Sequence, residues 1–310
     1  MITNKHISVL TTELIGSLPI QSNVAYVDAT LGGGGHSVAL IKKLLEANCR
    51  DVDLITCDLD QQAWKLFLKN LVHSAISYEE ITDEEIIVQN LINVKFRLEN
   101  FAEIKLVTQK KIVGFIADLG PSQNLLNADN GLSYLKDNYL DMRISRELSV
   151  TASDLLAVLS KKQLCYLFRE YADLKYALTL SEKIIDYRLT KKITTTYQLN
   201  EIVKQVLIKI NIPSTGKELT RNLAKVYQAF RIAVNLEYDN LSQFISNSYE
   251  RLSKTGILAL ITFHSGEQKV VSKFLKSLDN SYQVRVVEAS SEELEYNARS
   301  RSAKLYILTK

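Results

Sequence analysis

Three short apolar runs, each carrying an aspartate at or near its end, constrain the fold of this chain most. They lie at residues 24–30, 53–58 and 113–118. Helical patterns follow the first two runs, at residues 38–45 and 63–72. Strands that alternate with helices predict crossover connections and a parallel sheet. Because the strands are nearly continuous in apolar residues, we expect helices on both faces of that sheet.

The middle of the chain is helical in pattern. Capping boxes at Thr151 with Asp154 and at Ser160 with Gln163 mark two helix starts. One apolar helix face is formed by Leu199, Ile202, Val203, Val206, Leu207 and Ile210. A break at residues 212–216 precedes another long helical pattern, at about residues 219–252.

Strand patterns return near the end of the chain, at residues 256–264, 282–289 and 303–309. We therefore expect a discontinuous α/β core, a Rossmann-like, mostly parallel, doubly wound sheet. Residues 1–124 and 223–310 form this core, and residues 125–222 form an inserted all-helical domain. The acidic stretch at residues 74–85 is interpreted as a solvated surface insertion.

The composition narrows the class of protein. With 46% hydrophobic residues, the chain can bury enough apolar surface to fold. No stretch approaches the roughly 18 apolar residues of a spanning helix, so we expect no membrane partner. The first residues show no targeting pattern. Three cysteines without a CxxC pair indicate a reducing, cytoplasmic location and no zinc site.

A glycine run after the first strand is the sharpest local motif. Four glycines, residues 32–35, separate Asp28 from the next helix. Glycines allow a ligand close to the backbone, although a plain flexible turn has the same composition. A dinucleotide fingerprint would need a third glycine where this chain has Ser37, so an NAD-dependent oxidoreductase is disfavoured. An acid before the glycines is more typical of S-adenosylmethionine sites.

Polar residues stand at the ends of the predicted strands. Asp58 ends the second strand, and a carboxylate there can accept hydrogen bonds from both ribose hydroxyls of a nucleoside. Ligands of open α/β sheets bind beyond the carboxyl ends of strands. We therefore expect Asp28, Asp58, Asp118 and His264 to converge on one rim, although a lone histidine there would more often be structural.

Positive charge is concentrated in one region, although the whole chain carries only +3. Residues 188–231 hold nine Lys or Arg against two acids. Such a helical surface suits phosphate contacts, and a merely solvated surface explains it about equally well. A second small basic cluster lies at residues 297–304.

Several blocks in order resemble one family, over nearly the whole chain. These blocks are residues 6–10, 26–37, 58–60, 118–120, 131–134, 140–143, 227–235, 263–265 and 297–303. Together they are similar to the MraW/RsmH family, methyltransferases that use S-adenosylmethionine to modify N4 of a cytosine in 16S ribosomal RNA. The resemblance implies a methyltransferase core with an inserted helical domain.

The resemblance also implies site residues. Cofactor contacts fall on Gly34, Gly35, His36, Asp58, Phe101 and Asp118, with Gln123 or Asn124 as a further contact. Asp118 is the catalytic candidate, as acceptor of the N4 hydrogens, and His264 is a weaker candidate for orienting the base or moving a proton. The implied partner is 16S ribosomal RNA of the small subunit, with no metal.

The chain also departs from the family pattern. The stretch after Asp118 is one residue short, and Gly-Glu-Gln follows the block at residues 263–265. A methyltransferase of another RNA or of a protein therefore stays an alternative, as does a protein that binds S-adenosylmethionine or RNA without turnover. The sequence leaves monomer and homodimer open.

Overall fold

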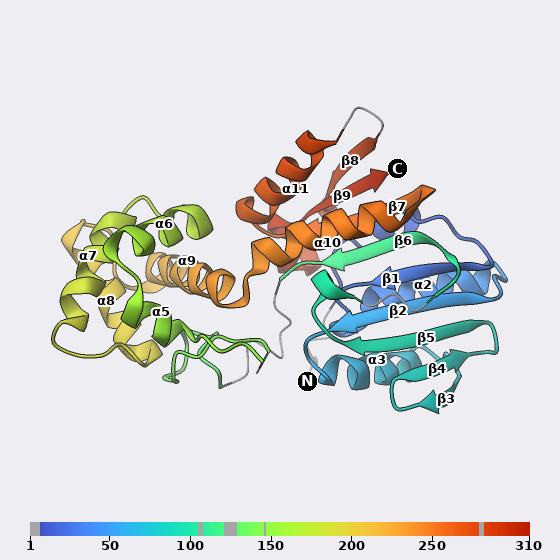
Figure 1. Cartoon of the computed structure of the whole chain (residues 1–310), viewed down its shortest axis with the longest axis horizontal. Coiled ribbons are helices and arrows are strands. Elements are labelled where there is room, and N and C mark those ends of the chain that lie inside the picture. Colours follow the sequence, from blue (N-terminus) through green and yellow to red (C-terminus); the bar gives the residue numbers. More distant parts are fainter. Residues whose placement is uncertain (1–6, 105–107, 121–128, 146, 279–281) are drawn as a thin grey trace. The chain divides into compact units, whose positions relative to one another are not determined.

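The structure of this chain is a computed structural model that describes residues 7–104, 108–120, 129–145, 147–278 and 282–310. The chain forms two compact units (Figure 1). The first consists of Met1–Gly120 with Asn240–Lys310, and the second of Pro121–Asp239. A helical unit therefore interrupts an α/β unit, as the sequence patterns predict.

The first unit is built on one mixed sheet. In the described part of the chain its nine strands have the order β3-β4-β5-β2-β1-β6-β7-β9-β8. Strands β5, β2, β1, β6 and β7 pair in parallel, whereas β9 is antiparallel to both β7 and β8. The strand bounds are β1 Val24–Asp28, β2 Val52–Asp58, β3 Tyr78–Thr82, β4 Glu85–Val88, β5 Ile92–Leu98, β6 Lys111–Asp118, β7 Leu252–Thr262, β8 Gln283–Glu288 and β9 Lys304–Thr309.

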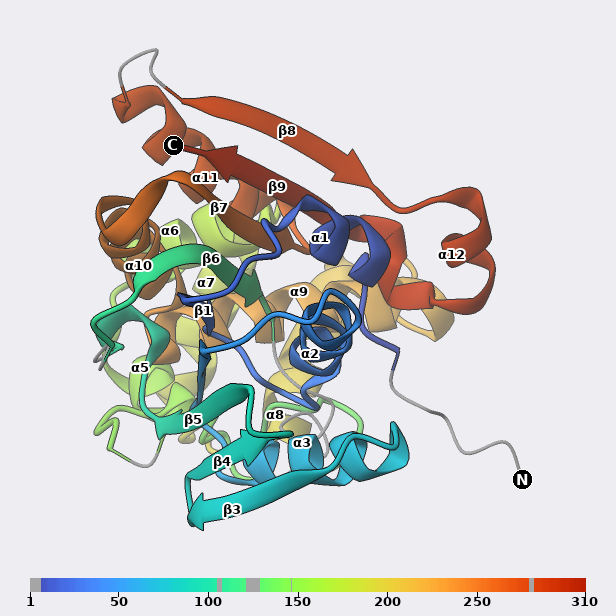
Figure 2. The ribbon, with the colours of Figure 1, turned by 90° about the vertical axis from the view of Figure 1, so that its right-hand side faces the viewer.

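Helices cover both faces of the sheet (Figure 2). On one face lie α1 (Thr11–Ser17), α2 (Gly35–Glu46) and α3 (Gln62–His73), whose apolar residues pack with Tyr26 and Leu54. On the other face, α10 (Glu237–Arg251) and α11 (Ser265–Ser277) pack with Val27 and Ile55. Because neighbouring strand residues point to opposite faces, each central strand contributes to both cores. The expected doubly wound, mostly parallel sheet is confirmed.

The acidic stretch after α3, expected as a solvated surface insertion, also contributes strands to the sheet. Residues 78–88 form the antiparallel hairpin β3–β4, and β4 pairs with β5 at the edge of the sheet. The side chains of β3 are mostly exposed, whereas Ile92, Val94 and Phe96 of β5 are buried. Strand β5 thus alternates buried and partly exposed residues, a period-two signal that the sequence reading missed.

The second unit is a helical bundle. Its helices are α5 (Ala152–Val158), α6 (Lys161–Ala172), α7 (Ala177–Arg188), α8 (Thr196–Lys209) and α9 (Gly216–Asn235). Both predicted capping boxes are present, at the starts of α5 and α6. The predicted apolar face of α8 is buried from Leu199 to Leu207.

The long helical pattern at about residues 219–252 is two helices. It is interrupted at Leu236, which has a φ of 51°. Helix α9 packs Leu223, Val226 and Phe230 into the core of the helical unit, so that unit continues to Asp239 and not only to residue 222. The sequence offers no proline or glycine at this break, which explains why the boundary was placed too early.

Three short elements complete the described chain. Helix α12 spans Ser291–Tyr296, and the 3₁₀ turns η1 and η2 span Phe101–Glu103 and Ala298–Ser302. Within the residues that the structure describes, no helix has both the length and the apolar character needed to cross a membrane.

Candidate active site

The carboxyl ends of the parallel strands bring the predicted rim residues to one edge of the sheet. Asp28, Asp58 and Asp118 end β1, β2 and β6, which are neighbours in the sheet. The turn η1 with Phe101 follows β5, and His264 follows β7. The strand order therefore places residues that are far apart in sequence along one edge, where α/β sheets bind ligands.

The glycine bend turns the chain from β1 into α2. Gly32 and Gly34 have φ values of 51° and 73°, a region that residues with a side chain rarely adopt. A Cβ on Gly34 would collide with the ring of Phe67, and one on Gly35 with the hydroxyl of Ser8. These two glycines are therefore required by packing within the protein. By contrast, a Cβ on Gly32 or Gly33 would meet only one atom within 4 Å, at 3.9 and 3.8 Å.

His36 anchors the N-terminal segment to this bend. Its side chain is 5% exposed, and Nε2 lies 2.9 Å from the carbonyl oxygen of Val9. Because a carbonyl can only accept, Nε2 carries the proton. The same segment is held at the C-terminal end of the chain, where Asn297 donates to the carbonyl of Ile7 at 3.2 Å. Nε2 of His36 is thus committed to the protein, so a cofactor contact from this residue would use Nδ1 or the backbone.

Asp58 joins β2 to the glycine bend. Its Oδ2 accepts a hydrogen bond from the backbone N–H of Gly32 at 2.8 Å, and its Oδ1 accepts one from Asp60 at 2.9 Å. Burial raises its pKa to about 6, opposed by these two hydrogen bonds. Each carboxylate oxygen keeps a second lone pair for a ligand hydroxyl.

Asp118 has an unsatisfied oxygen. Its backbone N–H donates to Oγ1 of Thr30 at 2.7 Å, but its buried Oδ1 has no hydrogen-bond partner in the described part of the chain. Burial raises its pKa to about 6, and the charges of His36 and Arg299 oppose that rise. A buried acceptor without a partner is costly in a folded protein, and a ligand that donates to it removes that cost.

Asp28 lies between the other two acids and is almost completely buried, at 1% exposure. Burial raises its pKa, and a 2.6 Å hydrogen bond from Oγ of Ser37 opposes the rise. Its charge raises the pKa of both Asp58 and Asp118. A cation bound at this edge would therefore be favoured by all three carboxylates.

Phe101 lies on the α10 side of the same edge. Its ring packs edge-to-face on Phe244 at 5.3 Å, and it lines a small cavity of about 140 Å³ together with Phe115, Asn247 and Arg251. The carbonyl of Ala102 accepts a 3.1 Å hydrogen bond from Asn247. Gln123 and Asn124, the remaining expected cofactor contacts, lie outside the described residues.

His264 begins helix α11 as its N-cap residue. Nδ1 accepts a hydrogen bond from the N–H of Glu267 at 3.4 Å, and Nε2 lies 3.0 Å from Oε1 of Glu267. The buried Glu267 carboxylate in turn accepts from the N–H of Phe263 at 2.7 Å. Both ring nitrogens therefore contact Glu267, an arrangement that suits a structural cap as well as a site residue.

Arg299 is a rim residue that the sequence analysis did not single out, because it assigned residues 297–304 to a basic cluster. Its guanidinium lies over the ring of Phe263, 5.5 Å from the centroid, and its charge lowers the pKa of Asp118. Only the fold brings residues 118, 263 and 299 together, so no local sequence signal could have found this arrangement.

The polar and charged groups at this edge of the sheet fit S-adenosylmethionine. The cofactor is a nucleoside with two ribose hydroxyls, a sulfonium and an ammonium. Asp58 offers acceptors for hydroxyls, the three strand-end acids favour a cation, and Oδ1 of Asp118 lacks a donor. The backbone at Gly32 and Gly33 faces open space that a side chain would partly fill.

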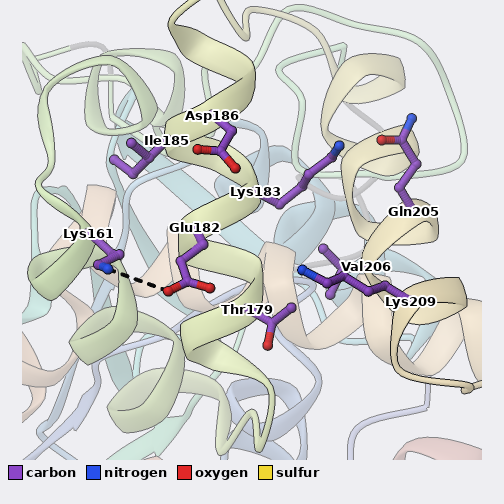
Figure 3. Close-up of a pocket in the computed structure, with 9 residues that line it drawn as sticks. All are labelled: Lys161, Thr179, Glu182, Lys183, Ile185, Asp186, Gln205, Val206 and Lys209. Atoms are coloured by element: carbon purple, nitrogen blue, oxygen red, sulfur yellow. Dashed lines mark hydrogen bonds and ion pairs between the residues drawn. The ribbon is translucent and has the colours of Figure 1, made fainter.

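The basic residues of the helical unit fall into two groups. Arg188 donates to the carbonyls of Leu156 and Leu159, and Arg231 forms a bidentate pair with Glu237, so these two are structural. Other lysines line a groove of about 540 Å³ between α6, α7 and α8 (Figure 3). There Lys161 pairs with Glu182 at 3.4 Å, whereas Lys183 and Lys209 point into the gap between α7 and α8.

Comparison with known proteins identifies the family. The model of the MraW methylase family matches residues 3–310. The chain belongs to this family. Ribosomal RNA small subunit methyltransferase H of Clostridium botulinum (strain Loch Maree / Type A3) is 34% identical over 99% of both chains. The protein of the same name from Mycoplasmopsis synoviae (strain 53) is 33% identical over 99% of this chain and 98% of its own.

This MraW methylase is therefore an S-adenosylmethionine-dependent methyltransferase, as the sequence motifs predicted. Among solved structures, an rRNA methylase from Streptococcus thermophilus aligns with 97% of this chain and 93% of its own, with a TM-score of 0.39 and 13% identity. The family match extends from the N-terminal segment bound by His36 to the final strand β9.

Proposed function

We propose that this MraW methylase transfers a methyl group from S-adenosylmethionine to the exocyclic N4 of a cytosine in 16S ribosomal RNA of the small subunit. The observation that carries the proposal is the buried, unpartnered Oδ1 of Asp118 on the same sheet edge as Asp58 and the glycine bend. The relatives of similar length are named as small-subunit ribosomal RNA methyltransferases, which supports this substrate.

Asp58 and the bend would hold the cofactor. The second lone pairs of the Asp58 carboxylate would accept the ribose hydroxyls, while the N–H of Gly32 keeps the carboxylate in place. Gly34 and Gly35 shape the bend, and Phe101 with Gln123 or Asn124 would border the cofactor. When bound, S-adenosylmethionine supplies a methyl group made electrophilic by the sulfonium.

Asp118 would act on the acceptor base. The lone pair of a cytosine N4 is delocalised into the ring, so the amine is a poor nucleophile until it becomes pyramidal. A carboxylate that accepts an N4–H hydrogen bond favours that change and stabilises the positive charge that develops on the nitrogen. The raised pKa of Asp118, about 6, leaves it ionised at neutral pH. His264 stays a second candidate for orienting the base.

The helical unit would hold the RNA around the target. A cytosine must leave its stack before it can enter the site, which is easiest in single-stranded or loop RNA. Lys183 and Lys209 in the groove of Figure 3 are candidates for contacts to the flanking phosphates. We place the reaction in the cytoplasm, where a ribosomal substrate would be met and where three free cysteines stay reduced.

Methyl transfer to purified 30S subunits tests the proposal. We expect label from methyl-labelled S-adenosylmethionine to enter the 16S RNA, and mass spectrometry of the digested RNA to find N4-methylated cytidine. Ribosomal RNA from cells that lack the protein should lose that nucleoside. Label in a protein, or equilibrium cofactor binding with no methylated product, would overturn it.

A further inference from the structure

The first turn of α8 and the loop at residues 135–140 form one joint in the helical unit. Tyr139 and Thr195 face each other across an antiparallel bridge. The N–H of Leu140 donates to the carbonyl of Thr194 at 2.8 Å, and the N–H of Thr196 donates to that of Asn138 at 2.9 Å. These bonds hold the backbone of Tyr139 beside the start of α8.

Side-chain hydrogen bonds stiffen the same joint. Oγ1 of Thr196 donates to the carbonyl of Lys136 at 2.7 Å and accepts from the N–H of Asn138 at 2.9 Å. The carboxylate of Asp137 accepts from the N–H of Tyr197 at 3.1 Å. The backbone that carries both tyrosines is therefore fixed before any ligand arrives, which lowers the entropic cost of binding.

This joint presents its aromatic side chains to solvent. Tyr139 and Tyr197 are 50% and 59% exposed, and Leu135, in the same loop as Tyr139, is 81% exposed. Within the described residues neither tyrosine ring packs against another aromatic side chain. Tyr166, at 62% exposure, differs in this respect, because its ring contacts Tyr171 edge-on at 6.5 Å.

Positive charge borders the exposed rings. Lys136 is next to Leu135 in the loop, and Lys191 and Lys192 shortly precede the bridge residue Thr195. All three are exposed. Lys136 pairs at 3.4 Å with Asp129, itself exposed, so this pair is a weak surface contact that a phosphate can replace. Asp137, in the same loop, accepts from the amide of Tyr197. Exposed aromatic rings flanked by cations are the combination with which proteins bind single-stranded nucleic acids, because bases stack on the rings while cations neutralise phosphates.

We propose that Tyr139 and Tyr197 form a stacking platform for unpaired bases of the ribosomal RNA, with Lys136 and Lys192 as its phosphate contacts. The inference rests on the proposed function, since that reaction requires unstacked RNA. It adds a base-contacting surface in the helical unit, made of aromatic rings and not of lysines alone. The platform would retain single-stranded RNA without selecting its sequence, because every base offers a stacking face.

Steady-state methylation of 30S subunits by single variants tests the platform. We expect Tyr139→Ala and Tyr197→Ala each to raise the KM for the subunit roughly tenfold, with kcat and cofactor affinity unchanged, because stacking of one base contributes about that much. Tyr139→Phe and Tyr197→Phe should stay near wild type, since a phenyl ring stacks equally well. Tyr166→Ala is the matched control and should leave the KM unchanged.

Salt dependence separates the two kinds of contact. Binding of a single-stranded oligocytidine, followed by fluorescence anisotropy, should weaken in Tyr139→Ala with an unchanged slope of log affinity against log salt. In Lys192→Gln that slope should become shallower by about 0.7. An unchanged KM in both alanine variants while wild type methylates the subunit would overturn the platform alone. Tyrosine-dependent RNA binding without methyl transfer would overturn the proposed function and leave the platform standing.

Discussion

The backbone N–H of Gly32 donates a 2.8 Å hydrogen bond to Oδ2 of Asp58. This bond connects the end of β2 to the bend that follows β1, so the residue proposed to bind the ribose also fixes the glycine turn. Asp58 holds its own position through a second amide, that of Asp60. Cofactor affinity and the shape of the bend are therefore coupled through one carboxylate.

Replacing this carboxylate should weaken cofactor binding. We expect Asp58→Ala to raise the Kd for S-adenosylmethionine roughly 10- to 100-fold, because charge-assisted hydrogen bonds to the ribose and the restraint on Gly32 are lost together. Isothermal titration calorimetry measures the change. Asp60→Ala is the control: its side chain accepts from the N–H of Gln62, while its backbone still donates to Asp58. An unaltered Kd in Asp58→Ala would remove Asp58 from the site.

Because of Asp58 and Asp118, we expect both folding stability and cofactor binding to depend on pH. Burial raises the pKa of Asp58 and Asp118 from 3.8 to about 6, so between about pH 4 and 6 the folded protein holds more protons than the unfolded chain. Stability contributed by these groups therefore falls as pH rises through that window. Binding of a cationic cofactor lowers both pKa values, so protons should be released near pH 6.

Calorimetry at pH 6 in two buffers of different ionisation enthalpy measures that release. We expect wild type to release protons on binding S-adenosylmethionine and Asp118→Asn to release fewer, since asparagine does not titrate. The same variant should retain its fold and lose methyl transfer to 30S subunits by at least a hundredfold. Equal proton release in both proteins would mean that Asp118 does not sense the cofactor.

Much of the fold can be predicted from the sequence because the strand patterns and helix caps that specify it are local. The apolar strands ending in Asp28, Asp58 and Asp118 fix the parallel core, and the capping boxes at Thr151 and Ser160 fix two helix starts. The hairpin β3–β4 does not follow from the sequence because the side chains of β3 are mostly exposed and β4 is only four residues long. Its pairing depends on the neighbouring strand β5.

The site could be predicted only in part, because some of its contacts join residues that are far apart in sequence. Strand-end acids can be listed from sequence, but the pairing of Arg299 with the Phe263 ring requires the sheet order. Likewise, the sequence does not show that a Cβ on Gly35, an expected cofactor contact, would collide with the hydroxyl of Ser8. Contacts between segments that are far apart in sequence leave no trace in the spacing of either segment.

The contact at Gly35 gives a stability test. We expect Gly35→Ala to destabilise the protein by roughly 1–3 kcal/mol, because the new methyl group would overlap the Ser8 hydroxyl. The Ser8 backbone cannot easily retreat, since its neighbours Ile7 and Val9 are held by Asn297 and His36. Adding Ser8→Gly should restore most of the loss in denaturant melts. A double variant no more stable than Gly35→Ala would show that another contact sets the requirement for glycine.

The role of His264 can be assigned by testing its function as a helix cap separately from any role in the reaction. Its ring caps α11 through Glu267, so His264→Ala should lower stability by about 0.5–2 kcal/mol. Asparagine is a good N-cap, and His264→Asn should therefore recover most of the melting temperature. If the ring only caps the helix, His264→Asn should also recover the methylation rate on 30S subunits. If the ring orients the base or moves a proton, stability will return while kcat stays low, and that split would place His264 in the reaction.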